Sequence, residues 1–208
     1  MASCAVFLMA DIPADVGRSF CSQFFCANHL IEKILDLFIE SNEEYVKEEY
    51  ADMSPEVSFY FMSSDDVNSL REASRPMEAF ASPFLGKTLQ ELYEWFDLNI
   101  TQQDPCDGDL FLESFLVLDE RSVQDHTCLF VSTQNGSPQS IRCDFYVPFD
   151  NATQCSVKEN IERGIMGRFM RSGRVMTWHG LHMAMHGGLY IEGGEVKEDE
   201  EWKEFLEN

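Results

Sequence analysis

Basic residues are scarce in this chain. Its 208 residues include 15 Lys and Arg against 37 Asp and Glu, which gives a formal net charge of −22 at pH 7. A field of this sign repels the phosphates of nucleic acids and anionic membrane surfaces. We therefore expect no nucleic acid partner and no membrane partner, and we expect a protein partner of basic character.

Long apolar runs are also missing, because no stretch approaches the ~20 apolar residues of a membrane-spanning helix. The opening stretch MASCAVFLMADIPADVG has no basic region before its short apolar run, and Asp11 and Asp15 follow directly. It predicts a first strand, not a signal peptide. The chain also has no G-x-S-x-G, G-x-G-x-x-G, P-loop, H-E-x-x-H or C-x-x-C motif, so no enzyme class is indicated.

Cysteine is present, but not in the pattern of a disulfide scaffold. The seven cysteines, at positions 4, 21, 26, 106, 128, 143 and 155, are odd in number and show no small-scaffold spacing. This predicts reduced thiols and a cytoplasmic location, with the nucleus as the alternative. The hydrophobic fraction of 44%, with 17 Phe, predicts a globular chain with a proper core.

Apolar periodicity divides the chain into a helix-rich and a strand-rich half. Strands are predicted over 4–10, 57–63, 113–121, 127–133 and 140–148, and helices over 28–40, 63–73, 87–98, part of 157–173 and 198–208. These elements predict an α+β (or α/β) fold with a mixed sheet and helices concentrated in the N-terminal half. We expect a single domain, 1–208; the alternative is a subdivision near residue 105 into a helix-rich 1–104 and a strand-rich 105–208.

The segment RVMTWHGLHMAMHGG, residues 174–188, has two interpretations. As a helix, it would place His179, His182 and His186 on one face within an arc of about 60°, where a transition metal could bind. As a strand leading into a hairpin at Gly187-Gly188, it would hold His182 and His186 roughly 13 Å apart, too far to share a metal. The glycines and the alternation of residue types favour the hairpin, and no cofactor is expected.

The strand end FLVLDERS, residues 115–122, supplies the candidate catalytic or small-molecule residues. Carboxyl ends of strands are where sites gather in α/β sheets, so a pocket formed by Asp119, Arg121 and His126 is one interpretation. The other is that these polar residues solvate a strand end and cap a turn. Cys128 lies two residues from His126, too far along a strand for direct proton transfer, and a buried inert thiol is expected there.

Arginines cluster where acids are missing. Residues 163–191 contain Arg163, Arg168, Arg171 and Arg174 with no acid, a local charge of +4, and residues 192–208 carry −6. These arginines could bind a phosphate, a carboxylate or an acidic peptide. Alternatively they neutralise the protein's own carboxylates, with the acidic terminal helix folded back on them and Trp202 and Phe205 buried.

Residues 112–160 carry one resemblance. The stretches FLVLDERSVQDHTCLFVS and SIRCDFYVPFDNA resemble an uncharacterised α/β domain family of fungal and bacterial cytosolic proteins. In that family a strand ends in Leu-Asp-x-x-Ser, a second strand follows, and an Arg-x-Asp/Glu-Phe strand completes the unit. No activity is attached to the family, so the resemblance implies fold and compartment only.

Together these features predict a non-catalytic interaction or regulatory protein whose strongly acidic surface binds a basic protein partner. The alternative is a small-molecule-binding protein or enzyme with a pocket near Asp119, Arg121 and His126. In that case a metal bound by His179, His182 and His186 would assist.

Overall fold

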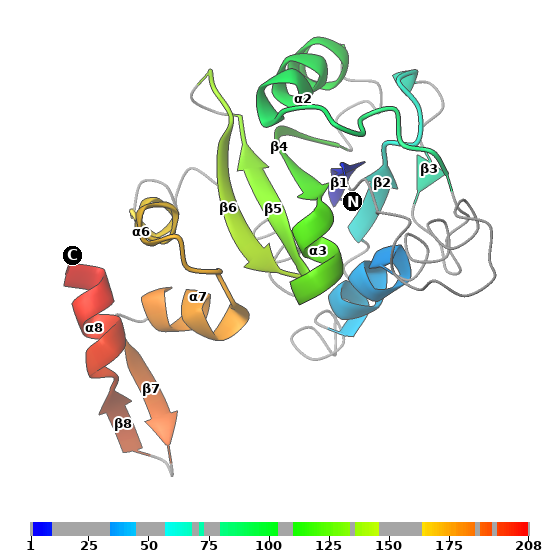
Figure 1. Cartoon of the computed structure of the whole chain (residues 1–208). Coiled ribbons are helices and arrows are strands. Elements are labelled where there is room, and N and C mark those ends of the chain that lie inside the picture. Colours follow the sequence, from blue (N-terminus) through cyan, green and yellow to red (C-terminus); the bar gives the residue numbers. More distant parts are fainter. Residues whose placement is uncertain are drawn as a thin grey trace.

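A mixed six-stranded sheet forms the centre of the protein (Figure 1). The computed structural model describes residues 2–9, 34–44, 57–67, 71–72, 80–103, 110–133, 136–145, 164–185, 188–192 and 195–207. The strand order is β3-β2-β1-β4-β5-β6. The strands are β1 (Ala2–Leu8), β2 (Val57–Phe61), β3 (Arg71–Glu72), β4 (Leu110–Leu118), β5 (Thr127–Ser132) and β6 (Gln139–Asp144).

The central strand β1 pairs in parallel with both neighbours, β2 and β4, and the remaining pairs are antiparallel. Cys4, Val6 and Leu8 belong to the core on one face of the sheet, and Ala5 and Phe7 belong to the core on the other. A strand buried on both faces reads as a continuous apolar run, which explains the CAVFL sequence.

Helices cover the two faces. On one face, the helical segment 34–44 contributes Phe38, whose ring packs edge-on against Phe59 and Phe145 at centroid distances of 4.9 and 5.3 Å. On the other face lie α2 (Leu89–Phe96) and the π-helical turn η2 (Asp97–Thr101), with Phe96 against Phe7 and Phe115. The 87–98 helix prediction is thus confirmed, and a capping box between Thr88 and Glu91 begins α2.

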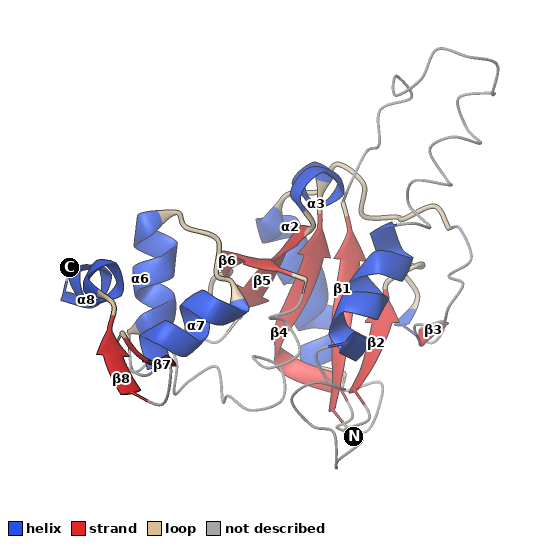
Figure 2. Ribbon diagram, turned by 90° about the horizontal axis from the view of Figure 1, so that it is seen from below, coloured by secondary structure: helices blue, strands red, loops and turns tan. Residues whose placement is uncertain are grey.

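A C-terminal group of elements lies beside β6 (Figure 2). It comprises α6 (Ile165–Ser172), α7 (Trp178–Met185), the antiparallel pair β7 (Leu189–Glu192) and β8 (Glu195–Glu198), and α8 (Glu200–Glu207). A parallel bridge joins it to β6: the Met176 N–H donates to Arg142 O at 2.8 Å, and the Asp144 N–H donates to Met176 O at 3.3 Å. Phe169 and Leu181 join the core that contains Cys143.

These elements confirm the α+β class and the mixed sheet. The concentration of helices in the first half is only partly supported, because α6, α7 and α8 follow the sheet. One sheet takes strands from both sides of residue 105, and residues 104–109, where the subdivision was predicted, lie outside the described residues. None of the helices in the described part of the chain has both the length and the apolar character that a bilayer crossing requires.

The helix predicted over 63–73 is wrong at its end, because Arg71 and Glu72 form β3. Glu72 pairs with Tyr60 of β2. Residues 63–66 are not helical either, and within this polar stretch the Ser64 hydroxyl accepts the Asp66 N–H at 3.0 Å.

The hairpin favoured for the histidine segment is also wrong, because residues 178–185 form α7. Gly180 does not break this helix: a Cβ added there would lie 2.8 Å from Cη2 of Trp202, so its bare backbone provides room for that ring. Thr177 Oγ1 accepts the Gly180 N–H at 3.1 Å, in the manner of an N-cap. The hairpin lies further along the chain, where β7 and β8 pair across residues 193–194.

Candidate functional site

Asp119 lies where β4 ends and α3 (Glu120–Asp125) begins. Its carboxylate accepts the Ser122 N–H at 3.1 Å, and the Ser122 hydroxyl accepts the Asp119 N–H at 2.9 Å. This reciprocal capping satisfies backbone donors that a helix start leaves without partners. The local sequence Asp-Glu-Arg-Ser therefore places Asp119 firmly at the carboxyl end of a central strand.

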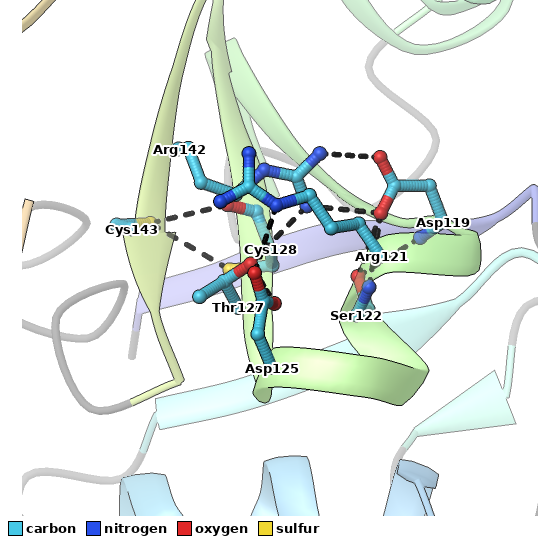
Figure 3. A network of polar contacts seen from close by, with 8 residues as sticks. All are labelled: Asp119, Arg121, Ser122, Asp125, Thr127, Cys128, Arg142 and Cys143. Atoms are coloured by element: carbon cyan, nitrogen blue, oxygen red, sulfur yellow. Dashed lines mark hydrogen bonds and ion pairs between the residues drawn. The ribbon is translucent and has the colours of Figure 1, made fainter. Parts of the chain in front are cut away.

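Arg142 of β6 reaches across β5 to this carboxylate (Figure 3). Its Nη1 donates to Asp119 Oδ1 at 2.9 Å, its Nη2 donates to Oδ2, and Nη1 also lies 3.3 Å from Thr127 Oγ1. The side chains of Arg142 and Asp119 are only 13% and 19% exposed. A bidentate pair with this little exposure holds both groups in a fixed orientation.

The Asp119–Arg142 pair also sets the charge state of this strand end. Partial burial raises the pKa of Asp119, but the hydrogen bonds and charge of Arg142, followed by those of Ser122, outweigh burial and hold this pKa below its ordinary value. Burial lowers the pKa of Arg142, and Asp119 more than reverses that effect. Asp119 is therefore ionised at neutral pH, and its carboxylate oxygens already accept hydrogen bonds from Arg142 and Ser122. This makes it a poor general acid or base.

Arg121 and His126 have other neighbours. Arg121 Nε donates to Asp125 Oδ2 at 2.8 Å on the exposed side of α3. His126 adopts a left-handed backbone conformation with φ 56° at the end of α3, and its exposed ring stacks on Phe145. Within the described residues, no hydrogen bond or ion pair joins Asp119, Arg121 and His126 to one another. The small-molecule alternative based on these three residues remains a prediction.

Cys128 and Cys143 face each other across β5 and β6, with 3.6 Å between their sulfur atoms. Both are buried and free, as is Cys4. Burial raises the pKa of Cys128 well above its ordinary value, with the Cys143 thiol adding to the effect, and burial raises the pKa of Cys4 to about 12. The thiolate is the reactive form, so Cys4 and Cys128 are poor nucleophiles and poor metal ligands.

In the histidine segment, His179 and His182 are both exposed and lie three residues apart on α7, on one helix face. His186 lies outside the described residues. In the part of the chain that the structure describes, no three His, Cys, Asp or Glu side chains are grouped so as to hold a metal ion. A metal at this segment therefore remains the alternative stated from the sequence.

Three of the four predicted anion-binding arginines come together, and the fourth, Arg163, lies outside the described residues. Arg168, Arg171 and Arg174 line an open hollow of ≈ 520 Å³ between α6 and α8, here called the arginine hollow. Ser172, Glu201, Glu204 and Phe205 complete its lining. Arg168 and Arg171 are three residues apart on α6 and share a face, and Arg174 follows the Gly173 that ends this helix.

Arg174 is the arginine that the acidic terminal helix neutralises. Its Nη1 lies 3.1 Å from Glu201 Oε1, and its guanidinium lies 5.1 Å from the centroid of the Phe205 ring. Phe169 of α6 packs on both Trp202 and Phe205 at centroid distances of 5.9 and 5.1 Å. The terminal helix thus folds back on the arginine segment, as predicted from the sequence.

Comparisons with models of known families, with curated proteins and with solved structures find no match. The resemblance of residues 112–160 therefore remains a prediction, and function has to be argued from the sites themselves.

Sequence reasoning missed Arg142, the partner of Asp119. A signal was present in SIRCDF: an arginine between apolar strand residues needs an acid nearby, because an unpaired charge is costly to bury. It also missed Ser172 as part of the arginine hollow, since nothing in a serine near a helix end distinguishes it from ordinary solvated surface.

Proposed function

We propose that the chain is a non-catalytic interaction protein whose acidic surface binds a basic segment of a partner protein. The observation that carries this proposal is the charge of the exposed side chains around the sheet. In the described part of residues 2–145, the exposed acids are Glu40, Glu44, Asp65, Asp66, Glu91, Glu94, Glu113, Glu120 and Asp125.

Exposed cations in the same part of the chain are few, and each is matched by an acid of its own helix or cap. Lys87 Nζ lies 3.8 Å from Glu91, and Arg121 pairs with Asp125. The remaining exposed acids give this surface a negative field, which attracts a basic partner and speeds its association. The same field repels polyanions, so the proposal includes no nucleic acid partner.

We further propose that this interaction occurs in the cytoplasm or nucleus. The free state of Cys4, Cys128 and Cys143 supports a reducing compartment, since Cys128 and Cys143 are close neighbours and still unpaired.

Binding of synthetic peptides tests the proposal. A fluorescent Lys-rich peptide is titrated with the full chain at an ionic strength of about 0.15 M, where the Debye length is about 8 Å. Its counterparts with Gln or Glu in place of Lys serve as controls. We expect saturable binding of the Lys-rich peptide alone, measured by fluorescence anisotropy. Equal affinity for the Lys-rich and Gln-rich peptides would refute the proposal.

Two matched charge reversals locate the surface. Glu44→Lys alters the helical segment on one face of the sheet, and Glu94→Lys alters α2 on the opposite face; both residues are exposed. A basic segment docked on one face should lose affinity with one variant and keep it with the other. Urea unfolding of both variants checks that their stability is unchanged.

A further inference from the structure

Two of the three guanidinium groups in the arginine hollow have no ion pair with any residue that the structure describes. Arg168 and Arg171 line the hollow from one face of α6, and within the described residues neither forms an ion pair. Arg174 differs, because Glu201 already neutralises it. Glu204 is the second glutamate in the lining, which therefore holds three arginines against two glutamates and keeps a net positive charge.

The backbone of α6 leaves room for the guanidinium of Arg171. A Cβ added to Gly167 would lie 3.3 Å from Nη1 of Arg171, so the guanidinium lies against the helix surface at a position where the side chain is missing. Phe205 contributes an apolar wall, and Arg174 lies over its ring. A volume of ≈ 520 Å³ falls in the range of small-ligand pockets and exceeds the size of a bare anion.

We propose that the arginine hollow binds a phosphate dianion, with Arg168 and Arg171 as its ligands and Phe205 against the group that carries the phosphate. The charges support a phosphate over a carboxylate. A phosphomonoester carries about −1.5 to −2 at pH 7 and matches two guanidinium groups, whereas a carboxylate neutralises one. The planar fork of arginine also donates two parallel hydrogen bonds to a phosphate.

This inference goes beyond the proposed function, because its ligand has the opposite charge and binds a different surface. The net charge of −22 opposes it at long range. However, charges further than the Debye length of about 8 Å at physiological ionic strength are largely screened, whereas a phosphate in contact with a guanidinium lies well within that length. Local contacts therefore decide the affinity once salt is present.

Phenyl phosphate is the probe, and phenyl sulfate is its control with a similar shape and a single charge. Calorimetric titration of the full chain at about 0.15 M salt should give saturable binding of phenyl phosphate at one site and clearly weaker binding of phenyl sulfate. Absence of saturable phenyl phosphate binding, or equal affinity for the two probes, would overturn the proposal.

Variants assign the binding to the hollow. Arg168→Gln with Arg171→Gln should lower the affinity for phenyl phosphate by about tenfold or more, since each substitution removes a charge-assisted hydrogen bond. Lys87→Gln changes the net charge in the same direction, at a position just before the distant helix α2, and should leave the affinity within about twofold. A similar loss of affinity in the double variant and in Lys87→Gln would show that only the net charge matters, and it would overturn the assignment to the hollow.

Glu201→Gln is a variant that should bind phenyl phosphate more tightly than the wild type does. It releases Arg174 from its ion pair, so a third guanidinium becomes available and phenyl phosphate should bind several-fold more tightly. A role of these arginines limited to holding α8 predicts no such gain, and an unchanged or reduced affinity would count against the proposal.

Two further probes identify the source of the phosphate. A short neutral peptide with one phosphoserine represents a phosphorylated protein segment, and inorganic phosphate represents the free ion. Tighter binding of the peptide would support a phosphorylated protein as the ligand, and tighter binding of inorganic phosphate would support the free anion. If neither binds while the basic-peptide titration succeeds, the phosphate site fails and the proposed function stands.

Discussion

Replacing Arg142 with Met tests whether the Asp119–Arg142 pair holds β4, α3 and β6 together. The substitution keeps much of the aliphatic length and leaves the Asp119 carboxylate without its main partner. Breaking a fully buried pair costs about 3–5 kcal/mol. Because both groups keep some exposure and Ser122 still donates to Asp119, we expect a loss of about 2–3 kcal/mol in the free energy of unfolding.

Substitutions of the partner separate charge from capping. Asp119→Asn keeps an oxygen for Ser122 but removes the charge, and should cost about as much as Arg142→Met. Asp119→Ala also removes the helix cap and should cost about 1 kcal/mol more. The double variant Asp119→Asn/Arg142→Met should be more stable than the sum of the single effects indicates, because neither charge is left unpaired.

Urea unfolding followed by tryptophan fluorescence measures these changes as shifts of the midpoint at constant slope. For a chain of this size, 1 kcal/mol corresponds to about 2–4 °C in Tm, so Arg142→Met should melt about 4–12 °C lower. A cost below about 0.5 kcal/mol, typical of ordinary surface substitutions, would refute the reasoning.

The pH dependence provides an independent check. The pKa of Asp119 in the folded protein lies below its ordinary value of 3.8, so ionisation of this group contributes stability that is fully present above the unfolded pKa. This contribution is lost as the pH falls through the lowered folded value. The stability difference between wild type and Asp119→Asn should therefore be constant from neutral pH to about pH 5 and shrink below about pH 4.

Three further predictions concern the packing of the C-terminal elements and the thiols. Gly180→Ala should destabilise the protein by about 1–3 kcal/mol although alanine favours helices, because its Cβ would meet Trp202. Gly167→Ala is the matched control: its Cβ would meet only the end of the flexible Arg171 side chain, so this variant should be neutral or stabilising in the same thermal melt. Phe205→Ala should lower the free energy of unfolding by about 2–3 kcal/mol through lost contacts with Phe169. Glu201→Gln should leave the urea midpoint nearly unchanged, because exposed ion pairs contribute little; a loss equal to that of Phe205→Ala would show that the ion pair holds α8 as strongly as the packing does. Cys4, Cys128 and Cys143 should resist iodoacetamide in the native state at pH 8 and react after unfolding in urea, because all three are buried. Peptide mass spectrometry measures the labelling, and rapid labelling of the native protein would contradict their burial.

Several elements could be predicted because their local patterns agree with their surroundings. The apolar runs at β1 and β5 and the alternation at β6 reflect burial directly, and the amphipathic spacing of α2 is visible without any tertiary contact. The mixed sheet follows from these elements.

The errors arose where a distant side chain decides the local conformation. Gly180 looks like a helix breaker until Trp202, far along the chain, is seen to occupy the space beside it. Arg71 and Glu72 form a strand only because β2 offers an open edge. The Asp119–Arg142 pair joins residues 23 positions apart, and the arginine hollow needs α6 and α8 to pack before its arginines share a surface. Such contacts leave no periodic signal in the sequence.

The bridge at Met176 has a consequence for the chain during synthesis. Until the residues after β6 have emerged, the outer main-chain groups of Gln139–Asp144 have no strand beside them, and an exposed strand edge is a template for joining another copy. Met176 occupies this edge, while the opposite edge consists of the two-residue strand β3, too short to recruit a neighbour readily. A chain truncated after Asp144 should therefore aggregate through intermolecular sheet formation, and nascent chains of that length should depend on chaperones.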